Sequence, residues 1–231
     1  MKRHIARFLL LIFLIIPVSV DAAKKTVRKP FMVDSFEDGD LSKDLEWWRF
    51  GDLDLSIVDN NKNEDPYLGR RSLRLTGDPS NWYIGGCGAF FGLDMTGFDA
   101  IKLIIRGNGE ETGLLQIELY DDDNQNWQIE PYQKDPSQTM ADDKFIYSKP
   151  ITWYGWKVLI IPLSHFVDDN KGIGDDIFNP YQLGSSGGLL QLQLVLLAVN
   201  RDVQPDIQID SIKFFKMQKE TRRPTFLDDD W

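Results

Sequence analysis

The side chains best suited to catalysis are few and poorly placed along this sequence. His165 is the single histidine beyond residue 22, and Ser164 precedes it directly, so on a strand their side chains would point to opposite faces. The chain offers no histidine pair for zinc and no evident partner to activate its one cysteine, Cys87. Two carboxylates at a fixed separation can hydrolyse glycosides, but among 36 acidic residues no pair stands out. We therefore do not expect an enzyme.

Residues suited to binding are much better represented. Residues 115–120 and 190–194 alternate apolar and polar side chains with a period of two, which is typical of half-buried strands. Because one face of each strand must enter the core, polar side chains are expected on the other face. They are Gln116, Glu118, Tyr120, Gln191 and Gln193. This face is either an ordinary solvated sheet or the floor of a groove, since amides both donate and accept the hydrogen bonds that sugar hydroxyls need.

Turn residues divide most of the chain into about ten short apolar or aromatic runs. No segment beyond the first residues shows apolar side chains at helical spacing over three turns, so we predict an all-β fold. Frequent turns between short strands favour a two-sheet antiparallel β-sandwich, or jelly roll, over a parallel sheet. The expected strands cover residues 31–36, 53–58, 72–76, 82–93, 100–106, 114–120, 145–147, 156–162, 189–197 and 206–215.

The first residues have the order of a secretory signal peptide. Three basic residues within the first seven positions precede an apolar run from Phe8 to Val20, and small residues follow. The run is shorter than the roughly 20 residues that a transmembrane helix needs. We expect cleavage after Ala22, no membrane span afterwards, and a periplasmic or secreted protein; the alternative is an uncleaved anchor.

Charge and cysteine content restrict the partners further. The formal net charge of −10 disfavours nucleic acid and anionic lipid, which bind basic patches, and leaves neutral ligands and cations. Cys87, as the only cysteine, cannot form an internal disulfide, and its apolar surroundings predict a buried thiol.

We divide the chain into a signal peptide (1–22), a linker (23–30), one sandwich module (31–216) and an acidic tail (217–231).

Four segments carry a resemblance to known proteins. They are MVDSFEDGD at 32–40, LDMTGFDAIKL at 93–103 with RGNG at 106–109, WKVLIIPLSHF at 156–166, and IQIDSI at 207–212. In this order they resemble the family eleven carbohydrate-binding modules and the related complex I intermediate-associated protein family. Both families resemble galactose-binding-domain jelly rolls, and the match covers residues 31 to 216.

The resemblance implies a sandwich whose concave face holds a glucan-like polysaccharide or oligosaccharide. Aromatic rings would stack on the apolar faces of sugar rings, while carboxylates and amides would bind the hydroxyls. The residues expected to bind the ligand are Trp48, Trp82, Tyr83, Tyr120, Asp122, Trp127 and Gln193. For each aromatic the alternative is a place in the core. For the face as a whole, the alternative is a protein partner in the cell envelope, bound by the same face or by the acidic tail.

The resemblance also implies a structural calcium ion. In many jelly-roll binding modules an early acidic residue and a late aspartate meet on adjacent strands and hold one. The matching residues are Glu37, Asp38 and Asp40 with Asp210. Calcium needs six to eight oxygens, so backbone carbonyls would have to contribute. The alternative is a capped turn and a solvated acidic edge.

Overall fold

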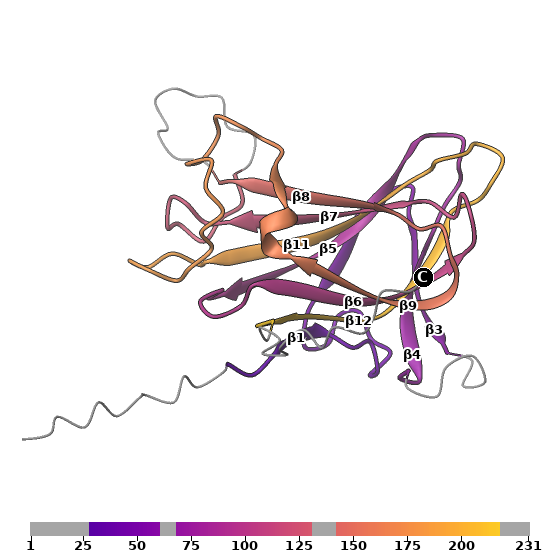
Figure 1. Cartoon of the computed structure of the whole chain (residues 1–231), viewed down its shortest axis with the longest axis horizontal. Coiled ribbons are helices and arrows are strands. Elements are labelled where there is room, and N and C mark those ends of the chain that lie inside the picture. The colour runs from indigo at the N-terminus through magenta and orange to yellow at the C-terminus, as the bar shows by residue number, and fades with distance from the viewer. Residues whose placement is uncertain (1–27, 61–67, 131–141, 218–231) are drawn as a thin grey trace, which may run out of the picture.

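The computed structural model describes residues 28–60, 68–130 and 142–217 (Figure 1). The predicted signal peptide and almost all of the predicted acidic tail lie outside these ranges, as does most of the linker. Within the three ranges, no helix is long and apolar enough to cross a membrane.

The described residues form two antiparallel sheets, as the sequence predicted (Figure 1). Sheet A has the order β3-β4-β12-β6-β9, with β1 paired to β12, and sheet B has the order β10-β8-β7-β11-β5-β2. Sheet A contains β1 (Phe31–Asp34), β3 (Asp54–Asp59), β4 (Arg71–Thr76), β6 (Ala100–Asn108), β9 (Tyr154–Pro162) and β12 (Asp206–Phe215). Sheet B contains β2 (Trp47–Gly51), β5 (Tyr83–Leu93), β7 (Leu114–Asp121), β8 (Lys144–Pro150), β10 (Val167–Asp168) and β11 (Leu189–Leu197). A 3-10 turn, Leu163–His165, follows β9.

Two of these strands, β2 and β10, were not predicted from the sequence. In β2 the side chain of Trp47 is buried, while those of Trp48 and Phe50 lie half-buried on the opposite face. Because both faces carry aromatic rings, the alternation of apolar and polar residues that marks a strand is missing. Strand β10 has only two residues, which is too short for any periodicity.

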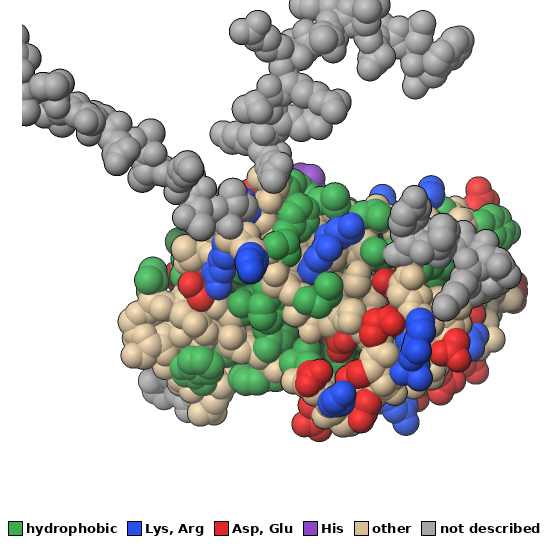
Figure 2. All heavy atoms as spheres, turned by 90° about the horizontal axis from the view of Figure 1, so that it is seen from below, with side chains coloured by type: hydrophobic (Ala, Val, Ile, Leu, Met, Phe, Trp, Pro, Cys, Tyr) green, Lys and Arg blue, Asp and Glu red, His purple; other side chains and the backbone are tan. Residues whose placement is uncertain are grey.

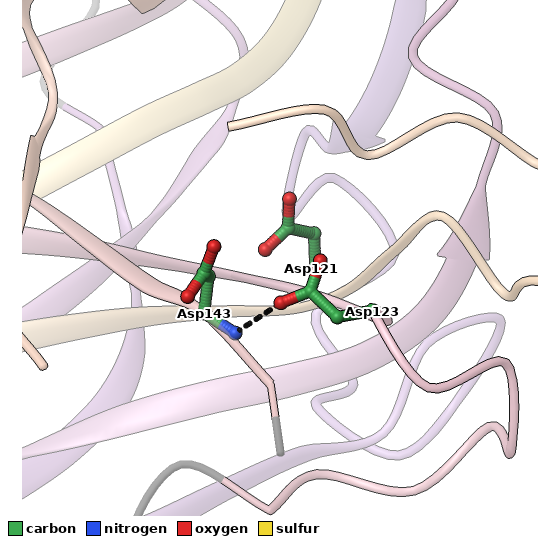
Figure 3. A group of neighbouring side chains, drawn as sticks. All are labelled: Asp121, Asp123 and Asp143. Atoms are coloured by element: carbon green, nitrogen blue, oxygen red, sulfur yellow. Dashed lines mark hydrogen bonds between the residues drawn. The ribbon is translucent and has the colours of Figure 1, made fainter. Parts of the chain in front are cut away.

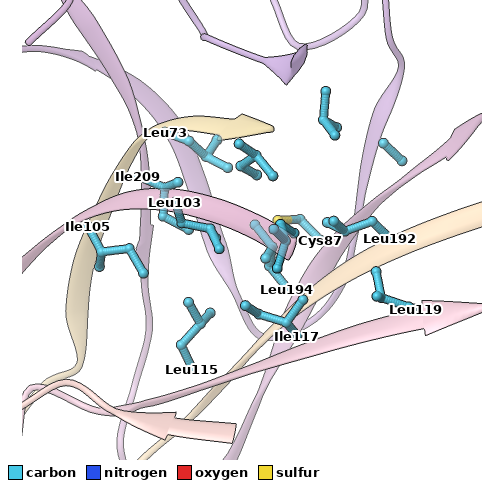
Figure 4. Packing of buried hydrophobic residues seen from close by; sticks show 14 of the residues in the cluster. Leu73, Cys87, Leu103, Ile105, Leu115, Ile117, Leu119, Leu192, Leu194 and Ile209 are labelled. Carbon is cyan, nitrogen blue, oxygen red and sulfur yellow. The ribbon is translucent and has the colours of Figure 1, made fainter. Parts of the chain in front are cut away.

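The core lies between the sheets and is built from alternate positions of their strands (Figure 4). Ile117 and Leu119 of β7 and Leu192 and Leu194 of β11 enter it from sheet B, and all four are fully buried. Sheet A supplies Leu73, Leu103, Ile105 and Ile209. The predicted alternation of β7 and β11 is therefore confirmed, and it turns their polar side chains away from the core.

The surface on the side of sheet A mixes apolar, basic and acidic side chains, with the acids gathered toward one end (Figure 2). Val158 and Ile160 of β9 are about half exposed there, and Tyr154, at the start of β9, is 83% exposed. Tyr154 is thus an exposed aromatic residue on the sheet opposite to the groove described below.

Cys87 occupies the core, as predicted, and is free and fully buried. Burial raises the pKa of its thiol, and the thiolate is the reactive form of cysteine. We predict that a thiol-specific chromogenic reagent labels the native protein only as fast as the protein unfolds. Protein unfolded in guanidinium is the control and should react at once. Equally fast labelling of the native protein would contradict the buried position.

Candidate ligand-binding site

A groove with a volume of about 750 Å³ lies on the face of sheet B that points away from the core. Its floor comes from the central strands β7 and β11, and one wall comes from β2 and the start of β5. The lining residues are Trp48, Phe50, Trp82, Tyr83, Gln116, Glu118, Tyr120, Ile129, Lys144, Gln191, Gln193, Val195 and Leu197. All five polar side chains that the sequence placed on this face are among them.

The floor of the groove is a hydrogen-bonded polar network centred on Glu118. Its carboxylate accepts hydrogen bonds from Gln116 Nε2 at 2.7 Å and from the Tyr120 hydroxyl at 2.6 Å. Lys144 Nζ lies 3.3 Å from Glu118 Oε1. The Tyr120 hydroxyl also lies 3.4 Å from Gln193 Oε1. Glu118 and Tyr120 are buried at the bottom of the groove. This network fixes the orientation of donors and acceptors before any ligand arrives.

Glycines of β5 allow aromatic rings of β2 to lie close against sheet B. A Cβ atom on Gly88 would lie 2.7 Å from the Trp48 ring, and one on Gly86 would lie 2.5 Å from the Phe50 ring. Trp48 pairs with Gly88 and Phe50 with Gly86 in the register of β2 and β5. The glycines that interrupt this aromatic stretch of the sequence therefore mark close approach of a neighbouring strand. They place the two rings of β2 along the groove wall.

Trp82 and Tyr83 form the most exposed part of the groove. Their side chains are 68% and 41% exposed, and their ring centroids lie 5.9 Å apart in an edge-to-face arrangement. Large aromatic side chains are usually buried, so an adjacent exposed pair beside a polar floor is suited to stacking against a ligand.

Of the residues predicted to bind the ligand, the structure brings five together in the groove: Trp48, Trp82, Tyr83, Tyr120 and Gln193. It places Asp122 and Trp127 elsewhere. Asp122 is buried and accepts hydrogen bonds from the backbone amides of Gly187 at 2.6 Å and Asn126 at 3.1 Å, so its carboxylate orders a loop. Trp127 packs against Gly92, and its indole nitrogen donates to Ser185 O at 2.9 Å.

Glu37 and Asp210, predicted to share a calcium ion, approach each other around Gly69. Asp210 Oδ2 accepts hydrogen bonds from the Gly69 amide at 3.1 Å and from Asn60 Nδ2 at 2.9 Å. Glu37 Oε1 accepts from the Arg71 amide at 3.1 Å, and a Cβ atom on Gly69 would collide with it. The side-chain oxygen of Asn60, Oδ1, is buried and has no hydrogen-bond partner in the part of the chain that the structure describes.

The other two predicted calcium ligands, Asp38 and Asp40, lie in an exposed turn. Asp38 Oδ1 accepts a hydrogen bond from the Asp40 amide at 3.1 Å, and Asp40 Oδ1 accepts one from the Ser42 amide at 2.9 Å. These contacts are those of ordinary turn-capping aspartates.

A second acidic group, Asp121, Asp123 and Asp143, was not predicted from the sequence as a metal site (Figure 3). One carboxylate oxygen from each residue lies within 4.8 Å of the others, so the group could hold a metal ion. Burial, with help from the neighbouring carboxylates, raises the pKa of Asp121 to about 9 and the pKa values of Asp123 and Asp143 to about 7. The only signal in the sequence was the run of three aspartates at 121–123, directly after an alternating strand.

No protein-family model matches the sequence, and no curated protein matches it either. Solved structures do share its fold. One is a family 11 carbohydrate-binding module from Clostridium thermocellum in complex with a beta-1,3-1,4-mixed-linked tetrasaccharide: identity is 13%, the TM-score is 0.51, and the match covers 82% of this chain and 97% of that one. Another is the family 11 module of the cellulosomal cellulase Lic26A-Cel5E of the same organism, with 13% identity, a TM-score of 0.50, and coverage of 84% and 98%. The chain also resembles an exo-beta-agarase, at 12% identity and a TM-score of 0.50, over 81% of this chain and 25% of that one.

The chain therefore has the fold of the family 11 carbohydrate-binding modules, a two-sheet jelly-roll sandwich. This agrees with the resemblance seen in the sequence. The other half of that resemblance, to the complex I intermediate-associated family, finds no support in these similarities.

Proposed function

We propose that the groove on sheet B binds a carbohydrate chain and that the protein does not catalyse a reaction on it. One observation carries the proposal: an exposed aromatic pair, Trp82 and Tyr83, stands beside a polar floor of glutamines, Tyr120 and Glu118. Rings of this kind cover the apolar faces of sugars, while a few fixed polar groups set the ligand's orientation. Similarity of fold to carbohydrate-binding modules supports the same conclusion.

The ligand we propose is glucan-like. The groove combines aromatic rings with a polar floor, and a module of the same fold was solved with a beta-1,3-1,4-mixed-linked tetrasaccharide. We further propose that binding takes place outside the cytoplasm, because the first 22 residues have the order of a secretory signal peptide.

A glycan array incubated with the purified protein tests this function. We expect retention on one class of glycans, with an affinity between micromolar and millimolar, which corresponds to about 4 to 8 kcal/mol. The array should be run with calcium and with a chelator, so that a contribution of bound ions is visible. A blank array in both conditions would contradict carbohydrate binding and leave the cell-envelope protein partner as the alternative.

We also propose a structural calcium ion between Glu37 and Asp210. The two carboxylates meet at Gly69, and both supply the charged oxygens that calcium accepts. Asn60, whose Nδ2 atom donates to Asp210 Oδ2, also has a buried Oδ1 atom without a hydrogen-bond partner among the described residues. The ion would join β12 to the turn that follows β1. Strands β1 and β12 are paired in sheet A. Glu37→Gln keeps the shape of the side chain and removes its charge. This variant should lose the increase in melting temperature that calcium gives at this site.

A further inference from the structure

The acidic group at the ends of β7 and β8 joins parts of the chain that are distant in sequence. Asp121 ends β7, Asp123 follows it, and Asp143 immediately precedes β8. Their carboxylates point toward a common space (Figure 3). Each also accepts a hydrogen bond from a backbone amide: Asn179 to Asp121 Oδ2 at 3.1 Å, Asp143 to Asp123 Oδ2 at 3.0 Å, and Ile177 to Asp143 Oδ2 at 3.0 Å. These bonds fix one oxygen of each carboxylate.

Among the described residues, the second oxygens of two of these carboxylates find no hydrogen-bond partner. Asp121 is 1% exposed and Asp143 is 0% exposed, and the Oδ1 atom of each is buried and unpaired. A buried polar atom without a partner is costly, and such atoms are rare in folded proteins. Two of them within one group indicate that something absent from the protein chain satisfies them.

The charges of the group are also uncompensated by the described part of the chain. None of the ion pairs formed by residues 28–60, 68–130 and 142–217 includes Asp121, Asp123 or Asp143. The nearby Lys144 forms ion pairs with Glu118 and Asp169. Three carboxylates this close repel one another unless they bind protons or a cation. Since all the available ligand atoms are oxygens, the fitting cation is a hard divalent ion.

Gly174 keeps the space between two of the carboxylates open. A Cβ atom at this position would collide with Asp143 Oδ1 and lie 2.5 Å from Asp123 Oδ2. Its φ of +78° is also one that side-chain-bearing residues rarely adopt. The glycine therefore lets the backbone of the loop before Asn179 lie directly against the acidic group.

From this geometry we propose that Asp121, Asp123 and Asp143 bind a calcium-type divalent cation, which fastens the end of β7, the start of β8 and the loop at 174–179 together. The site is separate from the one at Glu37 and Asp210, which joins the turn after β1 to β12 of the other sheet. It also stands independently of carbohydrate binding, because none of its three ligands lines the groove.

Calorimetric titration of the chelator-stripped protein with Ca²⁺, and separately with Mg²⁺, tests the proposal. Asp121→Asn and Asp143→Asn should each weaken Ca²⁺ binding at this site by at least about tenfold, because a charged oxygen ligand is lost. Two control variants should retain it: Asp202→Asn, which removes the same charge from an exposed turn, and Glu37→Gln, which alters the other acidic site. No binding of either ion by the parent protein would overturn the proposal. Unchanged affinity in both aspartate variants would do the same.

A second measurement needs no variant and so does not depend on how well the variants fold. In ¹H–¹⁵N NMR spectra of the parent protein, addition of Ca²⁺ should shift the amide signals of Asp143, Ile177 and Asn179, which donate to the three carboxylates. Shifts confined to the amides of Gly69 and Arg71 would place the ion at Glu37 and Asp210 instead and overturn the assignment.

Discussion

Replacing Trp82 by alanine is expected to abolish glycan retention while the melting temperature changes by less than about 2 °C. The indole is 68% exposed and contacts Tyr83 edge to face, so folding gains little from it. In a bound complex the same ring would be covered by sugar. Truncation of a central aromatic residue in a binding site typically costs about 2 kcal/mol or more, which is roughly a thirtyfold loss of affinity.

Tyr154→Ala is the matched control for this experiment. Tyr154 is even more exposed, at 83%, but it lies on β9 of sheet A, away from the groove. Affinity electrophoresis in gels containing a retained polysaccharide would compare the two variants, with circular dichroism following their melting. Normal retention of the Trp82 variant would show that the groove is not the binding site. A large loss of stability would show that Trp82 supports the fold.

Lys144→Met is expected to destabilise the protein by about 3–5 kcal/mol. Lys144 lies 3.3 Å from Glu118 and 2.7 Å from Asp169, and its side chain is only 10% exposed. Methionine keeps a long apolar side chain but leaves the Glu118 carboxylate, itself 7% exposed, without its buried cation. The hydrogen bonds that Glu118 accepts from Gln116 and Tyr120 would persist, so the main cost is an uncompensated charge beneath the groove.

Urea unfolding of two further variants separates charge from packing. Lys216→Met removes an exposed ion pair with Asp99, whose side chains are 46% and 34% exposed, and should cost less than about 1 kcal/mol. Adding Glu118→Gln to Lys144→Met should restore part of the lost stability, because it removes the stranded charge. If Lys144→Met cost no more than Lys216→Met, the buried network would not contribute to stability as described.

The arrangement of strands could be predicted wherever one face of a strand is apolar and the other polar. Residues 115–120 and 190–194 show this alternation, and in the structure they are the neighbouring central strands β7 and β11, with Leu192 and Ile117 in the core. Strand β2 could not be predicted in this way. Its aromatic rings lie on both faces of the strand. The rings on the face away from the core, Trp48 and Phe50, lie close against Gly88 and Gly86 of β5.

The candidate groove could be predicted in part for the same reason. Gln193 and Tyr120 follow from alternation within their strands, whereas the position of Trp127 depends on a loop that packs on Gly92. The acidic group could not be predicted from local patterns at all. Asp143 is 20 residues from Asp123 and meets it only when β7 pairs with β8. Pairing of this kind is a long-range property that composition and periodicity do not specify.

The most direct test of carbohydrate binding in the groove is an NMR titration with a beta-1,3-1,4-mixed-linked oligosaccharide, following the side-chain amide signals of the glutamines. We predict that the signals of Gln116, Gln191 and Gln193 shift together with the indole signal of Trp82, because all four side chains line the groove. The indole signal of Trp153, which donates to Ile105 O on sheet A, should remain unchanged. If binding shifted the Trp153 signal and left those of the groove in place, sheet B would not be the binding face and the proposed function of the groove would be wrong.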